Sequence, residues 1–512
     1  MTVIDYLLKA AAEKPQKIAF TDQDKGVTYA QVLETAQRIA TSLIHRFPQV
    51  NQPVAVLVDR NVESLCTFMG IAMSRNFYCP IDVTQPLQRI TTILGQMQPM
   101  AIVSIGNIPE ELRPLTDGPI LEYDDLLKTE ADHVQINNVR RGCLSTDPLF
   151  AICTSGSTGV PKGVLKSHQS VMDFIPVFCE TFHFNENDVF GNQAPFDFDV
   201  SVKDIYSTLY LGATMHVIPK VCFSMPKLLV EYLDDRKVTT LIWAVSALCI
   251  IAGVNAFKRK VPGSLRSILF SGEVMPIKML NVWRSYYPNA TFVNLYGPTE
   301  STGNCMYYII DREFGLTEKL PLGIPFCNQR VLFLNEQNKP IQPGETGEIC
   351  IMGNSLAMGY YRDLQKTAAS FVQNPLNDRY PERMYRTGDL AEMTPSGEYY
   401  FASRKDFQIK HMGHRIELEE IEVHCNAIDG VVRASCLFDT VRNKIVAYYA
   451  GELDKKEIIE QLKKHLPKYM IPNVFIKEDN LPLNKNGKID RQKLRQMYTA
   501  MQEIQNGKNT EY

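Results

Sequence analysis

The first part of the chain alternates between two hydrophobic patterns. Apolar residues recur at helical spacing over 30–44, and the short apolar run PVAVLVD follows from Pro53. A second helical pattern over 62–74 precedes the apolar run AIVS at 101–104. A period of three to four residues predicts a helix with one buried face, and short continuous apolar runs indicate buried strands. The alternation therefore predicts stacked strand–helix units.

The same alternation continues to about residue 297. Further apolar runs predict strands at 148–155, 212–218, 239–245, 267–272 and 291–297. Helical patterns cover 226–238 and 280–287, and Ser246 is placed to cap another apolar helix. Continuously apolar strands joined by helices indicate an α/β body with a mostly parallel, buried sheet.

The pattern changes after Pro321. The short β-like pieces RVLFL, GEICIMG and EYYFASR are separated by Gly and Pro and predict a small β-barrel or sheet that completes the body. Past Arg404 the charge rises, and helical and strand patterns together predict an α+β module of about a hundred residues. We predict an N-terminal domain over 1–404 and a C-terminal domain over 405–512, with a hinge at Asp406.

Length and charge limit the classes of function. A chain of 512 residues is too long for one ordinary core. A net charge of −3 gives no overall field for nucleic acid or anionic lipid. The longest apolar run, 241–254, is broken by Ser246 and has 14 residues, whereas a membrane helix needs about 20. The N-terminus lacks the positively charged segment that precedes the apolar stretch of a signal peptide, so it is not expected to be one. The twelve cysteines are scattered without a CxxC pair, as in reduced proteins. We expect a cytoplasmic protein without membrane insertion or a nucleic-acid partner.

The segment TSGSTGVPKG at 154–163 is the sharpest candidate for chemistry. It directly follows a predicted strand, and its glycines allow backbone amides to close on a phosphate, while Lys162 adds positive charge. It is not a Walker A loop, because no Ser or Thr follows the lysine. A flexible surface loop is the alternative, but a linker gains nothing from a fixed Pro-Lys-Gly ending. The candidate phosphate ligands are Thr154, Ser155, Gly156, Ser157, Thr158, Gly159 and Lys162.

This loop resembles that of the ANL superfamily of adenylate-forming enzymes, and further motifs follow in the family's order over nearly the whole chain. The segment NLYGPTE at 294–300 is similar to the family segment that contacts the nucleotide. The resemblance implies that Tyr296 lies on adenine, that Thr299 meets the α-phosphate and that Glu300 helps to hold Mg²⁺. It assigns nucleotide binding to Asn294, Leu295, Tyr296, Gly297, Pro298 and Thr299.

Three later motifs complete the resemblance. In YRTGDL, Asp389 matches the residue that accepts the ribose hydroxyls, and Phe401 and Arg404 match further nucleotide-binding positions. Asp406 matches the pivot of a mobile C-terminal domain, and Ser403 stands where the family usually has Gly. In NGKIDR, Lys488 matches the catalytic lysine, although a lone Lys in an Asn-Gly turn is ordinarily solvated surface.

The residue types suit adenylation, in which a carboxylate approaches a polyanion. At about 4 Å and an effective dielectric near 20, each pair of like charges repels by roughly 4 kcal/mol, so cations must be pre-placed. The resemblance implies ATP and Mg²⁺ as cofactors and Lys488, Glu300 and Thr154 as catalytic residues. It also implies that the C-terminal domain then rotates and admits a thiol, which takes the acyl group.

The substrate prediction rests on Asp199, Ser271, Gly303 and Lys488. In QAPFDFDVS, Asp199 aligns with the aspartate that holds a substrate ammonium in amino-acid-activating members; an ordinary turn acceptor is its alternative role. The chain is most similar to the D-alanine:D-alanyl carrier protein ligases, which load a carrier for lipoteichoic acid D-alanylation. Ser271 and Gly303 depart from them, since those ligases have Cys and an aliphatic residue there.

D-alanine and a phosphopantetheinylated carrier protein are therefore the expected partners. The carrier is expected in trans because the sequence ends 24 residues after Lys488. Lys463, Lys464 and Lys468 are candidate contacts for an acidic carrier, although such a run usually forms a solvated helix face. Alternatives are a short-chain acyl-CoA synthetase, another free-standing amino-acid adenylation enzyme, and a nucleotide-binding scaffold without catalysis.

Overall fold

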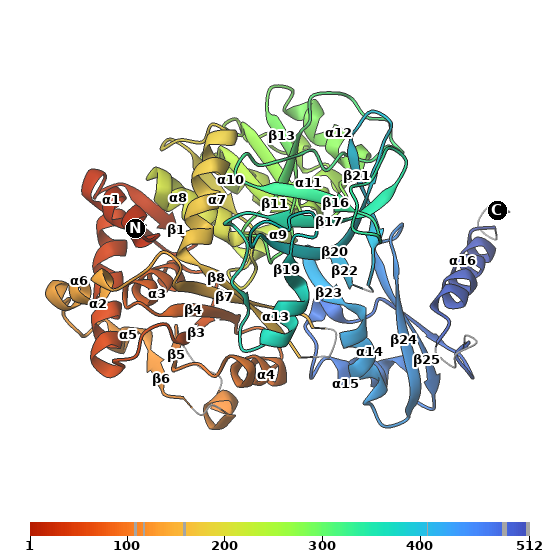
Figure 1. Cartoon of the computed structure of the whole chain (residues 1–512), viewed down its shortest axis with the longest axis horizontal. Coiled ribbons are helices and arrows are strands. Elements are labelled where there is room, and N and C mark those ends of the chain that lie inside the picture. The colour runs from red at the N-terminus through yellow and green to blue at the C-terminus, as the bar shows by residue number, and fades with distance from the viewer. Residues whose placement is uncertain (107–109, 116–117, 157–159, 407, 484–488, 508–512) are drawn as a thin grey trace. The chain divides into compact units, whose positions relative to one another are not determined.

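The computed structural model describes residues 1–106, 110–115, 118–156, 160–406, 408–483 and 489–507. By the density of its internal contacts the chain divides into two units (Figure 1). Unit 1 comprises Met1–Val83, Leu94–Cys153 and Lys162–Asp406. Unit 2 comprises Thr84–Ile93, Thr154–Pro161 and Phe407–Tyr512, and is therefore assembled from three stretches of sequence.

Unit 1 contains a nine-stranded sheet in the order β15-β14-β13-β12-β11-β9-β10-β1-β2. Neighbours from β13 through β1 are parallel, whereas β2, β14 and β15 are antiparallel to theirs. This confirms the mostly parallel sheet that the apolar runs predict. The strands are β1 (Ile18–Thr21), β2 (Gly26–Thr28), β9 (Val189–Asn192), β10 (Thr214–Val217), β11 (Thr240–Ala244), β12 (Ser267–Ser271), β13 (Thr291–Tyr296), β14 (Met306–Ile309) and β15 (Ile324–Pro325).

A seven-stranded sheet has the order β18-β8-β7-β4-β3-β5-β6. Strands β4, β3, β5 and β6 pair in parallel, β7 pairs in parallel with β4, and β18 pairs antiparallel with β8. The strands are β3 (Pro53–Val58), β4 (Phe77–Asp82), β5 (Ala101–Ser104), β6 (Ile120–Glu122), β7 (Pro148–Thr154), β8 (Lys162–Ser167) and β18 (Gly359–Tyr360). Strand β8 begins at the predicted phosphate-binding Lys162.

Two hydrophobic cores join these sheets to helices. The first packs α1 (Ile4–Glu13), α2 (Tyr29–Arg46), α3 (Val62–Met73), α7 (His168–Thr181) and α8 (Ser201–Leu211) against strands of both sheets. The second surrounds Trp243 and Trp283 and includes α10 (Pro226–Asp235), α11 (Val245–Gly253) and α12 (Ile277–Tyr286). The remaining helices before β16 are α4 (Leu87–Met97), the 3₁₀ helix η1 (Glu110–Leu115), α5 (Tyr123–Leu126), α6 (His133–Arg141), α9 (Lys220–Ser224) and the 3₁₀ helix η2 (Ala256–Lys258).

The predicted helix cap at Ser246 is wrong. Helix α11 begins at Val245, and Ala244 occupies the cap position without a capping side chain. Strand β11 ends at Ala244 and leads directly into the helix, so Ser246 already lies in the first helical turn. The start of α2, in contrast, has a side-chain cap, because Thr28 and Gln31 form a reciprocal capping box.

Most of the segment from Pro321 to Arg404 forms a five-stranded antiparallel sheet, which completes unit 1, whereas β15 and β18 join the two larger sheets. Its elements are β16 (Arg330–Leu334), β17 (Thr346–Met352), β19 (Phe371–Gln373), β20 (Arg383–Met393) and β21 (Tyr399–Arg404), with α13 (Leu364–Ser370) before β19. Phe333 and Tyr399 stack with ring centroids 3.6 Å apart. The core of this sheet includes Tyr296 at the end of β13.

The C-terminal part of unit 2 has the predicted α+β character. Its elements are β22 (Gln408–His411), β23 (His414–Glu417), α14 (Leu418–Asn426), β24 (Val431–Asp439), β25 (Lys444–Gly451), α15 (Lys455–Leu462), the 3₁₀ helix η3 (Lys468–Met470), β26 (Val474–Lys477) and α16 (Arg491–Gly507). Arg89 belongs to the same unit, and its guanidinium lies 2.5 Å from the buried carboxylate of Glu420. The predicted domain limits and the pivot role of Asp406 stay predictions.

Candidate active site

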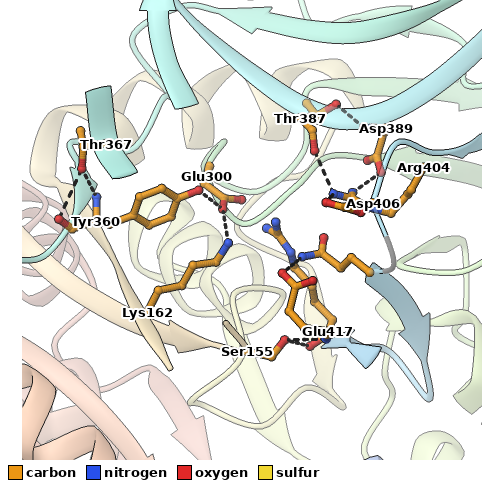
Figure 2. Close-up of polar contacts among 12 residues, drawn as sticks. Ser155, Lys162, Glu300, Tyr360, Thr367, Thr387, Asp389, Arg404, Asp406 and Glu417 are labelled. Carbon is orange, nitrogen blue, oxygen red and sulfur yellow. Dashed lines mark hydrogen bonds and ion pairs between the residues drawn. The ribbon is translucent and has the colours of Figure 1, made fainter. Parts of the chain in front are cut away.

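Lys162, Glu300 and Tyr360 form a buried charged cluster in unit 1 (Figure 2). The Lys162 amine at the start of β8 lies 3.6 Å from Glu300 Oε1, and the Tyr360 hydroxyl donates to that oxygen at 2.7 Å. The Lys162 amine also lies 4.9 Å from the centre of the Tyr360 ring. Glu300 is 0% exposed. A buried carboxylate is stable only with such charge and hydrogen-bond partners, so the sequence-predicted phosphate lysine and metal ligand lie side by side.

A second cluster is built around Asp389 on β20. Tyr296 donates its hydroxyl hydrogen to Asp389 Oδ2 at 2.5 Å, and the Arg404 guanidinium pairs with Asp389 Oδ1. Arg404 lies opposite Asp389 in the β20–β21 pairing, which explains how residues 15 positions apart meet. Burial and the neighbouring carboxylate raise the pKa of the Tyr296 phenol well above its usual range. The phenol therefore stays protonated and remains a donor.

The backbone of β20 just before Asp389 and the end of β21 fix this second cluster. Gly388 has a φ of +73°, a conformation that glycine adopts without strain. The Arg404 guanidinium also donates to the Thr387 carbonyl at 3.1 Å and to both carboxylate oxygens of Asp406 at 2.6 and 2.9 Å. Asp406, the predicted hinge residue, is thus held by the predicted ribose-binding arginine.

The other predicted nucleotide residues of unit 1 lie on β13, on the turn after it and on β21. The side-chain amide of Asn294 donates to the Pro321 carbonyl at 2.9 Å. Leu295 is buried in the large core. A Cβ on Gly297 would lie 2.7 Å from Asn304 Cα, so only glycine allows that close approach. Pro298 and Thr299 are buried. Phe401 is half-buried and packs on the core that contains Tyr296.

The predicted substrate residues lie at the ends of three elements of unit 1. Asp199 is half-buried just before α8, and Ser271 is buried as the last residue of β12. Gly303 has a φ of +66°, and a Cβ there would lie 2.2 Å from the ring of Phe174. The space into which a side chain at 303 would project is therefore filled by an aromatic ring.

Of the described residues of the predicted phosphate loop, Thr154, Ser155 and Gly156 belong to unit 2, whereas Lys162 belongs to unit 1. The Ser155 hydroxyl donates to the Arg415 carbonyl at 2.8 Å and accepts from the Glu417 amide at 3.2 Å (Figure 2). The buried hydroxyl of Thr154 has no hydrogen-bond partner among the described residues. A Cβ on Gly156 would lie 2.2 Å from the Val160 carbonyl oxygen. Ser157, Thr158, Gly159 and Lys488 lie outside the described residues.

These residues have the chemistry that ATP requires. The Thr154 hydroxyl is a buried donor without an acceptor, which a phosphate oxygen can supply. Asp389 is a buried carboxylate of the kind that accepts from a ribose diol. Within the described ranges no three His, Cys, Asp or Glu side chains are grouped to hold a metal ion. Mg²⁺ bound with a nucleotide needs only one or two protein carboxylates, and the buried carboxylate of Glu300 is the candidate for one of them.

Several residues of these clusters were not predicted from sequence. Tyr360 lies 60 positions after Glu300, and only the pairing of β18 with β8 brings it there. Lys166 on β8 and Lys203 on α8 are buried lysines. Two lysines four positions apart within the otherwise apolar stretch of β8 were a signal that could have been noticed, because such positions share one face of a strand.

Two properties bear on the sequence-based expectations of location. Among the helices that the structure describes, none has the length and apolar character to span a bilayer. All twelve cysteines are free thiols.

Comparison with known proteins establishes the family. The family described as AMP-binding enzyme matches residues 7–361, so the chain belongs to the AMP-binding enzyme family and is an AMP-forming ligase. Enzymes of this family use ATP, generally with Mg²⁺. The match confirms the adenylate-forming resemblance that the motifs carry.

Particular relatives narrow the comparison. The chain is 30% identical over 508 residues to the D-alanine--D-alanyl carrier protein ligase of Lacticaseibacillus rhamnosus, across 96% of this chain and 98% of that protein. It is also 30% identical over 499 residues to tyrocidine synthase 3 of Brevibacillus parabrevis, across 96% of this chain and 8% of that protein. The solved structure of holo-PA1221, a peptide-synthetase protein with adenylation and PCP domains, has a TM-score of 0.82 at 24% identity. It covers 96% of this chain and 84% of that one, and it shows the shared fold.

Proposed function

We propose that this chain activates an amino acid with ATP and transfers it to the phosphopantetheine thiol of a carrier protein in trans. The buried carboxylate of Asp389, held by Tyr296 and Arg404, is the observation that carries nucleotide binding. Membership of the AMP-binding family and the likeness to a carrier protein ligase support the two-step reaction.

In the first step a carboxylate oxygen of the amino acid bonds to the α-phosphorus of ATP. The bond between the α-phosphorus and the bridging oxygen breaks, and pyrophosphate leaves. Lys162 supplies positive charge near the phosphates, and Lys488 is the proposed contact of both the attacking carboxylate and the α-phosphate. Glu300 is the proposed protein ligand of Mg²⁺, which when bound would neutralise phosphate charge. The hydroxyl of Thr154 is a proposed donor to a phosphate oxygen.

In the second step the carrier thiol loses its proton and attacks the acyl carbon, and AMP leaves. We propose that residues 405–512 rotate about Asp406 between the two steps, because Lys488 and the thiol need the same space. The side chains of Lys463, Lys464 and Lys468 are exposed, as a docking surface for an acidic carrier requires.

D-alanine is the substrate that the relative's name suggests, and lipoteichoic acid D-alanylation is the process that this substrate would serve. The proposed location of the enzyme itself is the cytoplasm. Asp199 is the proposed partner of the substrate ammonium, and Ser271 and Gly303 are the other proposed substrate contacts. A short-chain acyl-CoA synthetase is the competing function. Its substrate would leave the Asp199 carboxylate without a partner, which a site selective for apolar acids avoids.

ATP–pyrophosphate exchange tests the proposal. The reaction should be measured with D-alanine, L-alanine, glycine, serine and acetate, with Lys488→Ala as the control that abolishes exchange. Exchange with an amino acid but not with acetate is the expected result. Exchange with acetate alone would contradict the activation of an amino acid but would still support adenylation. No exchange with any of these acids would favour a nucleotide-binding scaffold without catalysis.

A further inference from the structure

Arg60 joins the carboxyl ends of strands that belong to two different sheets. It lies between β3 of the seven-stranded sheet and α3, and its guanidinium reaches the end of β9 in the nine-stranded sheet. The guanidinium donates to the carbonyl oxygens of Asn192, at 2.8 Å, and of Gln193. It also donates to the side-chain oxygen of Asn192 at 3.2 Å. Ligands of α/β proteins bind at the carboxyl ends of parallel strands, so these contacts lie where they can affect a ligand site.

The acceptors of Arg60 are unusual for a guanidinium that is partly withdrawn from water. The side chain is half-buried, and within the described residues no carboxylate lies at ion-pair distance from it. Its buried Nε atom has no hydrogen-bond partner among them. A charge that leaves water is costly unless polar groups replace the water. Here two backbone carbonyls and one side-chain amide do so, and the guanidinium in turn holds that backbone in place.

Asn192 carries the contact on to the start of α8. Its side-chain amide donates to Asp204 Oδ2 at 2.8 Å, and Asp204 is 0% exposed in the first turn of α8. The Asn192 side chain therefore lies between a guanidinium and a buried carboxylate and is hydrogen-bonded to both. Residues 193–200 connect β9 to α8, so both ends of this segment are held by the same group of side chains.

The interior of the segment 193–200 is also ordered by contacts. The Phe198 amide donates to the Pro195 carbonyl at 3.2 Å and closes a turn. The buried ring of Phe196 packs edge-on against Phe68 of α3, with ring centroids 6.0 Å apart. Asp199 follows directly after this turn. A shift at the start of the segment would therefore reach the carboxylate that is proposed to bind the substrate ammonium.

We propose that Arg60 is a positioning residue for the amino-acid subsite and acts by holding, through Asn192 and Gln193, the segment that carries Asp199. The inference rests on the proposed function, in which Asp199 binds the substrate ammonium. Among the described residues, those proposed to bind ATP form no hydrogen bond with Arg60. Loss of the guanidinium should therefore weaken amino-acid binding and leave ATP binding unchanged.

The first test separates the two KM values in ATP–pyrophosphate exchange with the full chain. The amino acid is whichever of D-alanine, L-alanine, glycine and serine the wild type exchanges fastest. Arg60→Met should raise the KM for this amino acid by about tenfold or more and change the KM for ATP by less than about threefold. Arg60→Lys should give a smaller rise, because it keeps the charge but lacks the planar fork of donors. The control Arg46→Met, at an exposed arginine of α2, should match the wild type.

A double variant separates a positioning role from a purely structural one. Asp199→Asn should by itself raise the KM for the amino acid. Adding Arg60→Met to Asp199→Asn should change that KM by less than about threefold, because the carboxylate that Arg60 positions is already gone. A purely structural role would give the same fold-change in both backgrounds.

Three results would overturn the inference. An amino-acid KM that Arg60→Met leaves unchanged would show that the segment does not depend on the guanidinium. Equal rises in the KM values for the amino acid and for ATP, or full additivity in the double variant, would show that Arg60 stabilises unit 1 as a whole. If Arg60→Met does not fold, the same comparisons with Arg60→Lys decide. A wild type that exchanges none of the amino acids would contradict the proposed function itself, and with it the inference that rests on it.

Discussion

Replacing Lys166 by methionine tests whether a neutral amine is buried in unit 1. Methionine has a similar length and no charge, so the change removes the titrating group with little change in volume. Burial lowers the pKa of Lys166 from its ordinary 10.5 to about 7, while the nearby carboxylates of Asp199 and Glu300 partly oppose this effect. The unfolded chain therefore binds this proton more tightly than the folded chain does.

The sign and size of the effect follow from that difference. Above pH 10.5 the amine is neutral in both the folded and the unfolded chain. Its titration then takes nothing from the free energy of unfolding. As the pH falls towards 7 the unfolded state gains the proton first, and stability is lost. The difference between 10.5 and about 7 corresponds to about 5 kcal/mol, or about 1.4 kcal/mol for each pH unit. The Lys166→Met variant has no amine at this position, so its free energy of unfolding does not show this pH-dependent loss.

Urea unfolding followed by tryptophan fluorescence is the appropriate assay. The only two tryptophans, Trp243 and Trp283, lie in the core of unit 1, so their signal reports the unit that contains Lys166. The variant should gain stability relative to wild type at pH 7. That advantage should shrink by about 3 kcal/mol between pH 7 and pH 9.5. The control Lys278→Met, at an exposed lysine, should follow the wild type.

If the free energies of unfolding of the variant and the wild type differed by the same amount from pH 7 to pH 9.5, the reasoning would be refuted. It would mean that Lys166 has the same pKa in the folded and unfolded chain, and that any change in stability comes from packing alone.

Three further predictions concern other parts of the chain. Asp389→Asn should lower kcat/KM for ATP by about 100-fold in pyrophosphate exchange, because it removes the charge that Arg404 faces; unchanged kinetics would remove the proposed ribose contact. Arg89→Met should destabilise unit 2 by about 3–5 kcal/mol, because it leaves Glu420 buried without its partner. Faster hydrogen exchange over 408–483 would show this, and adding Glu420→Gln should restore most of the loss. Gly303→Ala should lower the Tm by a few degrees in calorimetry, because it combines a φ of +66° with a clash against an aromatic ring; an unchanged Tm would contradict that argument.

The α/β body could be predicted because its parallel strands are covered on both faces. Such strands are apolar throughout, and β11 and β12 lie within the runs 239–245 and 267–272. Strand β8 did not show this signal, because Lys162 and Lys166 interrupt its apolar residues. Strand β4 includes a proline, which argues against a strand in local terms.

The candidate site was predictable where its residues lie together in motifs. The positions of Glu300 and Asp389 follow from NLYGPTE and YRTGDL. The contacts of Tyr360 with Glu300 and of Lys203 with Asn304 do not follow from motifs, because they join segments that are far apart in sequence. Register and chain path set such pairs, and neither can be derived from a local pattern.

The assembly of unit 2 from three stretches of sequence limits how the protein can be divided. A fragment limited to 405–512 would lack Arg89 and Ser155, so the buried carboxylate of Glu420 and the backbone at 415–417 would lose their partners. A rotation of 405–512 alone would have to break the same contacts. The contacts of Arg89 and Ser155 would therefore add to the energetic barrier to any such rotation, although both residues lie hundreds of positions before the proposed hinge.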